Sequence, residues 1–371
     1  MLLFLAAISF GCTNKKPSAG ISTAAYYWKT TLDFDTTDQK IAHDIGLKTL
    51  YVRCFDVDYS AGFGMAIPLG ELSGMRSDDI SAYDIVPVVY LTQAVLNNLS
   101  ERGLDSLAER IWPKIQKHNQ SFAQSAVNAA FYKLSDAARD SLYEKYGYNY
   151  TDSLAKVYAV NNYPEIQMDC DWSKSTRDKY FGFLKTMKRI SGKRLTCTLR
   201  LHQFADRDVL PPVDAVMLMA YNVSNIKQSD APNAIIAPDK INAYLKGGTY
   251  PLPLDVALPI FSWAACYRGG QYVGLLRDVW ATDVANNETF HSLGDNRYRM
   301  TRDTVMGHLF LRTGDELRVD EPSEKVLRET AQTIHSHAGQ TSGYRIAFFD
   351  WNTTKISNYA PVIKNIVGTS R

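Results

Sequence analysis

Apolar runs rich in β-branched and aromatic residues recur along this chain, and stretches with helical spacing separate them. Runs of this kind are typical of buried strands. The runs that predict strands cover residues 21–28, 50–55, 85–91, 166–171, 195–201, 215–221, 256–263 and 344–349. Strands that alternate with helices indicate a parallel sheet, so the pattern predicts an α/β chain.

The stretches between these runs supply the helices. Apolar residues at helical spacing predict helices over 38–45, 175–190, 239–245 and 324–337. Ser175 with Asp178 predicts a capping box at the second of these helices. Glycines stand where left-handed helix caps are expected, at Gly192, Gly247, Gly248 and Gly339. Eight strands with helices between them predict a single (β/α)8 TIM-barrel domain over residues 21–371.

Two segments are longer than a minimal barrel needs. The first, about 92–163, follows the third strand and contains amphipathic stretches at 104–117 and 121–146, so it predicts a helical excursion of more than one helix. The second, about 267–322, lies between the seventh and eighth strands and combines glycine-rich turns with short β-like runs. It predicts a small α+β insertion.

Composition excludes some classes of protein. The chain has 371 residues, of which 45% are hydrophobic and 22% charged, and its net charge is only +2. Because cations and acids are interspersed, the charge pattern gives no footprint for nucleic acid. Four cysteines have no zinc or redox spacing, so we expect buried free thiols at Cys54, Cys170, Cys197 and Cys266. We expect a monomer without a cofactor or metal; acids side by side could also hold Ca²⁺ or Mg²⁺, but no dense run of oxygen ligands supports such a site.

The first residues predict where the protein resides. Met1 to Phe10 is apolar but too short to span a bilayer, and Gly11-Cys12 then leads into a polar stretch. This start resembles a bacterial lipoprotein signal peptide, which implies a signal peptide and linker over 1–20 and acylation of Cys12. The resemblance implies a lipid-anchored protein of the bacterial cell envelope, at the outer membrane or in the periplasm. An ordinary cleaved signal peptide or an unrelated apolar start are the alternatives.

The ends of the strands carry the candidate chemistry, because side chains at the carboxyl ends of barrel strands face a shared mouth. The candidates for substrate binding there are Arg53, Asp56, Arg200, His202, Asn222, Trp263, Asp350 and Trp351. Aromatic side chains at this mouth, with Tyr27 and Trp28 among them, either offer flat platforms to sugar rings or close the top layer of the barrel.

The fourth predicted strand presents Asp169 and Asp171, two residues apart and therefore on one face. Two carboxylates close together in an apolar barrel raise each other's pKa, which suits acid catalysis near neutral pH. The alternative is a structural pair in which each acid forms a salt bridge with Arg53 or Arg200.

This strand resembles the motif of glycoside hydrolase family 18, the chitinase-like barrels, which reads Asp-x-x-Asp-x-Asp-x-Glu. Asp169 and Asp171 match its second and third aspartates, while Ile166 replaces the first and Ser173 replaces the Glu that is the family's general acid. Residues 214–222 resemble the family's sixth strand, with Tyr221 retained. Asn222 stands there in place of an Asp. Bacterial relatives that also lack the Glu are a closer likeness.

The resemblance implies a barrel that binds, and in the family hydrolyses, a β-linked N-acetylhexosamine polymer, with Asp169, Asp171 and Tyr221 as catalytic residues. With Ser173 in place of Glu, the proton donor would be Asp171, Asp56, Asp58 or Asp350, with His202 as a further acid or base. Carboxyls about 5 Å apart would suit a retaining reaction, and roughly 6.5–9.5 Å an inverting one. Two alternatives stay open: a non-catalytic module that binds an oligo- or polysaccharide, and a structural or assembly lipoprotein.

Overall fold

The computed structural model describes residues 20–75, 80–338 and 343–368. Its eight parallel strands pair into a closed ring, because the last strand in the order pairs with the first. In ring order they are β1 (Ser22–Tyr27), β3 (Leu47–Ser60), β6 (Asp84–Leu91), β7 (Glu165–Cys170), β8 (Arg194–Arg200), β9 (Ala215–Met219), β10 (Leu254–Pro259) and β18 (Arg345–Phe349). The predicted (β/α)8 barrel is confirmed.

Two predicted strands differ most from the structure in their bounds. The run 256–263 divides, because β10 ends at Pro259 and β11 (Trp263–Arg268) belongs to another sheet. The strand predicted over 50–55 is longer: β3 continues past the ring and pairs antiparallel with β4 (Met65–Leu69). A short parallel pair is formed by β2 (Thr31–Leu32), which precedes this hairpin in the chain, and β5 (Gly74–Met75), which follows it.

Helices between the strands cover the barrel, and their buried faces pack on its core. They include α2 (Thr36–Asp44), α7 (Arg177–Ser191), α9 (Pro238–Leu245), α11 (Glu324–Ala338) and α12 (Thr353–Gly368). The capping box predicted at Ser175 is wrong, since α7 begins after Thr176 without a side-chain cap and the Ser175 hydroxyl lies 2.9 Å from that of Ser173. Gly192 ends α7 with φ 61°, as predicted.

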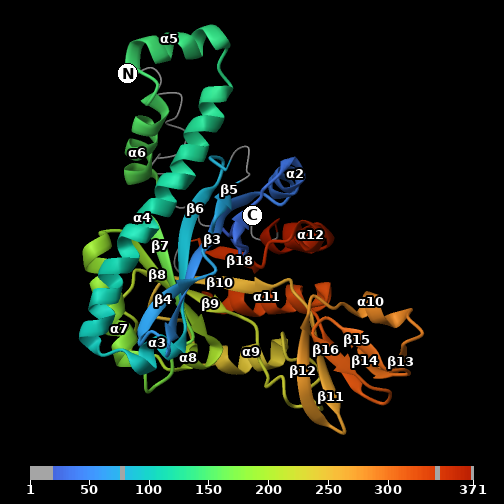
Figure 1. The fold of residues 1–371 in the computed structure, drawn as a ribbon. Helices are drawn as coiled ribbons and strands as arrows, with labels where there is room; N and C mark the ends of the chain where they lie inside the picture. The colour runs from blue at the N-terminus through green and yellow to red at the C-terminus, as the bar shows by residue number, and fades with distance from the viewer. Residues whose placement is uncertain (1–19, 76–79, 339–342, 369–371) are drawn as a thin grey trace.

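The helical excursion after the third barrel strand forms a long arm (Figure 1). It consists of α3 (Gln93–Asn98), α4 (Glu101–Tyr132), α5 (Asp136–Tyr146) and α6 (Tyr150–Asn162). The excursion has more than one helix, as predicted, but the amphipathic stretches 104–117 and 121–146 do not match single helices, because the buried face of α4 continues through Asn119 and Phe122. At 1.5 Å per residue α4 is about 48 Å long, roughly twice the length of an eight-residue strand. It therefore extends past the barrel.

The arm projects at the amino-terminal end of the barrel, opposite the mouth. Strand-start residues such as Asp84 and Glu165 line one cavity, of about 880 Å³, with Ala126 of α4 and Tyr158 of α6. Gly20, where the described chain begins, lines the same cavity. The helices α3 and α8 (Leu201–Ala205) instead follow carboxyl ends of strands and lie at the far end in Figure 1. The arm built from α4 to α6 therefore points away from the mouth, whereas α3 lies at the mouth, where the Gln93 side chain donates to the Asp171 carbonyl.

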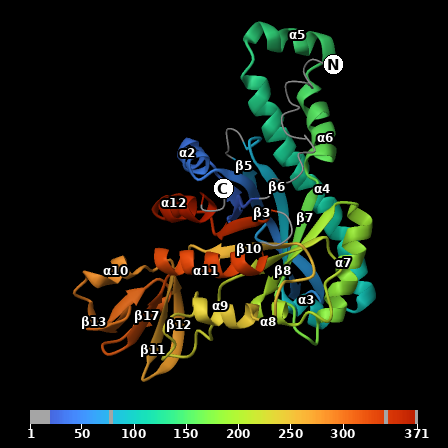
Figure 2. The ribbon, with the colours of Figure 1, turned by 180° about the vertical axis from the view of Figure 1, so that it is seen from behind.

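The insertion between the seventh and eighth barrel strands is a separate small sheet, and it lies on the side of the barrel away from the helical arm (Figure 2). Its strand order is β12-β11-β17-β14-β13, and a hairpin of β15 and β16 lies within the same segment. The remaining elements are β12 (Gln271–Arg277), α10 (Ala281–Ala285), β13 (Phe290–Gly294), β14 (Arg297–Met300), β15 (Thr304–Met306), β16 (Leu309–Leu311) and β17 (Glu316–Asp320). Residues such as Cys266, Tyr298 and Leu317 give it a core of its own.

Three further points concern the cysteines, membrane-spanning helices and two predicted residues outside the described ranges. The four cysteines outside the first residues are buried and free, as predicted. No helix among the described residues is both long enough and apolar enough to cross a bilayer. Cys12, the predicted acylation site, lies outside the described residues, as does Gly339.

Candidate functional site

The mouth of the barrel gathers the predicted acids, but each of them has a partner. Asp169, near the end of β7, is only 6% exposed and accepts a hydrogen bond of 2.6 Å from the Thr198 hydroxyl on β8. Burial raises the pKa of Asp169 to about 7; the Thr198 hydrogen bond opposes that rise and the charge of Asp171 adds to it. Asp169 is therefore a protonatable group beneath the surface of the mouth.

Asp171 lies one residue past β7 and is bound to Arg200 at the end of β8. The Arg200 Nε is 2.6 Å from Oδ1 of Asp171, and its Nη2 donates to Oδ2. Burial alone would lower the pKa of Arg200, but the hydrogen bonds and charge of Asp171 outweigh it and raise that pKa. Asp171 thus forms the salt bridge with Arg200 that was the alternative to catalysis in the sequence analysis. Asp169 instead accepts a hydrogen bond from a hydroxyl and is not bound to an arginine.

Arg53 and Asp56 form a second two-point ion pair on the rim. Nε to Oδ1 is 2.7 Å and Nη2 to Oδ2 is 2.5 Å. The Arg53 guanidinium also lies 5.8 Å from the ring centroid of Trp28. Next to this pair, Asp58 accepts a 2.5 Å hydrogen bond from the Thr92 hydroxyl.

Tyr221 follows β9 and fills the centre of the mouth. It is 3% exposed, and its ring stacks on Phe349 at 5.7 Å and meets Phe261 edge-on at 5.6 Å. Burial, together with the charge of Asp169, holds the pKa of Tyr221 well above its usual value. The phenol therefore stays neutral, in the same interior as Asp169.

The next predicted residues lie at the edge of this centre. Asn222 is exposed with φ 56°, and its N–H donates to the Ile235 carbonyl at 2.7 Å. His202 is exposed on α8 and not on the strand, and burial and the charge of Arg200 lower its pKa. Asp350 is partly exposed, with the Lys355 ammonium 3.7 Å away, and burial raises its pKa.

Two aromatic residues predicted as sugar platforms are buried, and these predictions are wrong. Trp351 is 0% exposed, and its indole N–H donates to Asp38 at 2.9 Å while its ring packs on Phe34. Tyr27 is also 0% exposed, and its hydroxyl bonds to the chain at Thr31 and Asp33. Tyr27 connects β1, and Trp351 connects the end of β18, to the segment that follows β1. Because both side chains are buried in these contacts, neither has surface for a ligand.

Four other aromatic rings form a continuous row across the mouth. Trp28 lies 5.4 Å from Phe349, Phe349 lies 5.9 Å from Phe261, and Phe261 lies 5.4 Å from Trp263, each measured between ring centroids. All four are partly exposed. The sequence pointed to Trp28 and Trp263 but not to Phe261 or Phe349, which the strand pattern assigns to the core. Their position at or just past the end of β10 and β18 was the available signal.

Ser173 stands where the resemblance places a general acid. Its hydroxyl lies 2.9 Å from that of Ser175 and 3.2 Å from that of Thr176. A cluster of hydroxyls cannot supply the proton that a carboxylic acid would. In the described part of the chain no group of three or more His, Cys, Asp and Glu side chains is placed to hold a metal ion.

A second polar cluster lies at the opposite end of the barrel, in the wall of the 880 Å³ cavity. Arg345 donates to Glu165 through Nη2 at 2.6 Å and to the Tyr51 hydroxyl at 2.6 Å, and its backbone N–H donates to Asp255 at 2.8 Å. Glu165 is 5% exposed. The cluster links the starts of β7, β10 and β18 and is a structural clamp on the closed ring.

Comparison with known proteins finds likeness in fold only. No family model matches the chain, and no curated protein matches it. Among solved structures it is similar to the spore cortex-lytic enzyme SleL of Bacillus cereus, with 15% identity over 94% of this chain and 75% of that chain at a TM-score of 0.47. It is also similar to a family GH18 chitinase from Cycas revoluta, with 12% identity over 93% and 99% at a TM-score of 0.44. Values this low say nothing of activity, and the barrel is established by its own strand pairing.

Proposed function

We propose that this chain binds a glycan across the barrel mouth and does not hydrolyse it. The observation that carries the proposal is the row of four partly exposed rings, Trp28, Phe349, Phe261 and Trp263. Flat aromatic faces stack on the apolar faces of sugar rings. The neighbouring rings here are tilted against each other by 48–83°, so they offer several separate faces to a chain of sugars.

The polar groups beside the row suit hydroxyl recognition. Asp171 and Asp56 are each held by an arginine and remain partly exposed, with 34% and 25% of their side chains accessible. A carboxylate fixed by a guanidinium presents acceptors and donors in set directions, which lowers the entropy cost of binding. By the family resemblance, the proposed ligand is an oligo- or polysaccharide of the N-acetylhexosamine type.

The same ion pairs argue against hydrolysis. The acids considered as proton donors all have partners: Asp56 has Arg53, Asp58 has Thr92, Asp171 has Arg200 and Asp350 has Lys355. Asp169, whose pKa is near neutral, is buried under the row with Tyr221. An acid must reach the glycosidic oxygen to protonate it. Of these acids, Asp350 combines partial exposure with a raised pKa, and the Lys355 ammonium 3.7 Å away opposes that rise and favours the ionised form.

For location, we propose attachment to the membrane of the bacterial cell envelope through Cys12. Gly20 lies at the amino-terminal end of the barrel, so a tether at that end would direct the mouth away from the bilayer.

The test combines binding with cleavage. The melting temperature of the full chain is measured with chitotetraose, with muropeptides released from peptidoglycan, and with cellotetraose as a control. In separate samples the folded protein is incubated for a long time with each sugar, and the sugar is then chromatographed to detect cleavage. A rise in melting temperature with an N-acetylhexosamine sugar left intact supports the proposal. Cleavage would overturn its non-catalytic part. A melting temperature that no sugar changes would favour a structural role, in which Tyr221 and Asp169 simply fill the mouth.

A further inference from the structure

Strand β17 of the insertion carries two charged residues with no exposed surface. Arg318 and Asp320 are both 0% exposed, two residues apart on one face, with Nε to Oδ1 at 2.8 Å and Nη2 to Oδ2 at 2.9 Å. A buried ion pair is a weak source of net stability, because desolvation offsets most of the attraction. The two members of the pair also hold other parts of the molecule.

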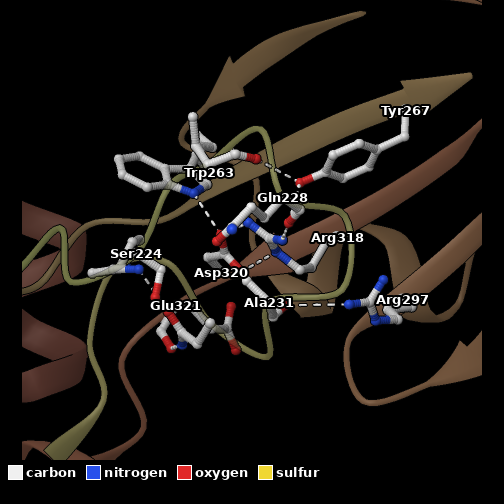
Figure 3. A network of polar contacts seen from close by, with 12 residues as sticks. Ser224, Gln228, Ala231, Trp263, Tyr267, Arg297, Arg318, Asp320 and Glu321 are labelled. Carbon is white, nitrogen blue, oxygen red and sulfur yellow. Dashed lines mark hydrogen bonds and ion pairs between the residues drawn. The ribbon is translucent and has the colours of Figure 1, made fainter. Parts of the chain in front are cut away.

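Asp320 holds the last ring of the aromatic row. The Trp263 indole N–H donates to Oδ2 of Asp320 at 2.8 Å, and the two residues face each other in the β11–β17 ladder (Figure 3). Phe261 packs against the same indole, with the ring centroids 5.4 Å apart. An indole fixed by a charged acceptor and a neighbouring ring keeps a single orientation before any ligand arrives.

Arg318 holds the loop that leaves the centre of the mouth. Its Nη1 donates to the Gln228 carbonyl, and its guanidinium lies 5.6 Å from the Tyr267 ring, whose hydroxyl donates to the Ile226 carbonyl at 2.7 Å. Arg297 of β14 donates to the Ala231 carbonyl at 3.2 Å. Figure 3 shows these side chains reaching one loop from three strands of the insertion. This loop starts directly after Tyr221 and Asn222.

We propose that Arg318 and Asp320 are positioning residues for glycan binding: they fix Trp263 beside Phe261 at one end of the aromatic row and so make the insertion one end of the binding site. The proposal rests on the proposed function. It assigns the insertion the recognition of the part of the glycan that extends beyond the barrel, since Trp263 is the ring where the row passes from β10 to the insertion sheet.

The matched control is a second buried acid of the same insertion. Asp315 is 3% exposed and accepts from Arg268 at 2.9 and 2.6 Å, but it contacts no ring of the row. Asp320→Asn and Asp315→Asn each remove a buried negative charge from the side of an arginine, which is Arg318 with 0% exposure in the first case and Arg268 with 39% of its side chain accessible in the second. Both variants lose stability, so a difference between them in the mouth reports position and not folding.

The first measurement needs no glycan. The full chain is labelled with 5-fluorotryptophan, and Trp263→Phe identifies the Trp263 signal among the six tryptophans. We expect a shifted or broadened fluorine resonance for Trp263 in Asp320→Asn and an unchanged one in Asp315→Asn. An unchanged resonance in Asp320→Asn overturns the proposal, whatever the result of any binding assay.

The second measurement uses chitotetraose in a double-mutant cycle. We expect about tenfold weaker binding in Trp263→Ala. Asp320→Asn alone should lose a similar factor, and the double variant should lose little more, because both changes remove one platform. Losses that multiply would show that Asp320 acts elsewhere and would overturn the proposal. If the wild type binds no chitotetraose, the proposed function fails for this sugar, while the fluorine result still decides the positioning of Trp263.

Discussion

Asp171 and Arg200 are joined at two points at the mouth, with Nε of Arg200 2.6 Å from Oδ1 of Asp171 and Nη2 donating to Oδ2. The pair joins the ends of two neighbouring strands, β7 and β8, and remains partly open to solvent. The acid of this pair, Asp171, is one of the two carboxylates that the motif resemblance assigns to catalysis, and Arg200 is bound to both of its oxygens. The site is therefore arranged to present a fixed polar edge and not a free acid.

Breaking this pair gives the first prediction. Arg200→Gln leaves Asp171 without its cation, and we expect the free energy of unfolding to fall by about 1–3 kcal/mol. Chitotetraose binding should also weaken by about tenfold, because the polar edge loses its orientation. Urea unfolding and calorimetric titration measure the two effects. Arg299→Gln is the control, since its exposed pair with Glu316 should contribute well under about 1 kcal/mol.

The aromatic residues separate binding from folding. Trp28→Ala removes an end ring of the row and should weaken glycan binding by about tenfold with a modest loss of stability. Trp351→Phe should do the reverse, since the lost indole N–H leaves the buried Asp38 with one fewer donor, and unfolding should become easier by about 1–3 kcal/mol. Equal effects of both variants on binding would contradict the assignment of Trp351 to the core.

The raised pKa of Asp169 predicts a pH dependence with a definite sign. Because its pKa is about 7 in the folded protein and near 4 in the unfolded chain, the folded state binds the proton more tightly. The contribution of Asp169 is therefore fully favourable below about pH 4, and it declines as pH rises to about 7, by an amount on the order of 4 kcal/mol at most. Asp169→Asn cannot ionise, so its stability relative to wild type should rise over this window in urea titrations. A constant difference from pH 4 to pH 8 would refute the assignment.

The amino-terminal clamp should matter for stability alone. Glu165→Gln leaves Arg345 with weaker partners in a mostly buried setting, and we expect a loss of roughly 2–4 kcal/mol in urea unfolding. Glycan affinity should be unchanged once the variant is folded, because the clamp lies at the other end of the strands. A fall in affinity at a temperature well below unfolding would show that the two ends are coupled.

The lipid anchor is tested in cells. Cys12→Ser should abolish incorporation of labelled palmitate and move the protein from the membrane fraction to the soluble fraction. Ser18→Cys together with Cys12→Ser serves as the control, since a cysteine outside the signal motif should not restore the label. Labelling that persists in Cys12→Ser would rule out acylation at this residue.

The sequence predicted the barrel well because burial on both faces makes each parallel strand a continuous apolar run. It predicted the mouth less well. The period of a strand gives the face of Asp169, but it does not give the partner of Asp171, since the choice between Arg53 and Arg200 depends on how the ring closes. Likewise, Trp351 and Phe349 are two residues apart at one strand end, yet one turns to Asp38 and the other lies in the row.

Errors elsewhere have the same physical origin. Amphipathic spacing in the arm does not show that α4 is one helix of 32 residues. Trp263 was assigned to the seventh barrel strand because the apolar run continues across Pro259, although that residue ends β10. In both places a local pattern continues, and only tertiary packing fixes where an element ends.

The arm also affects how the size of this protein must be measured. A rod of helix standing beyond a barrel raises the frictional coefficient of the molecule without adding much mass. A monomer would therefore leave a size-exclusion column early and imitate a larger species. Light scattering or sedimentation equilibrium should therefore decide whether the chain is a monomer, because both methods give a molar mass that does not depend on molecular shape.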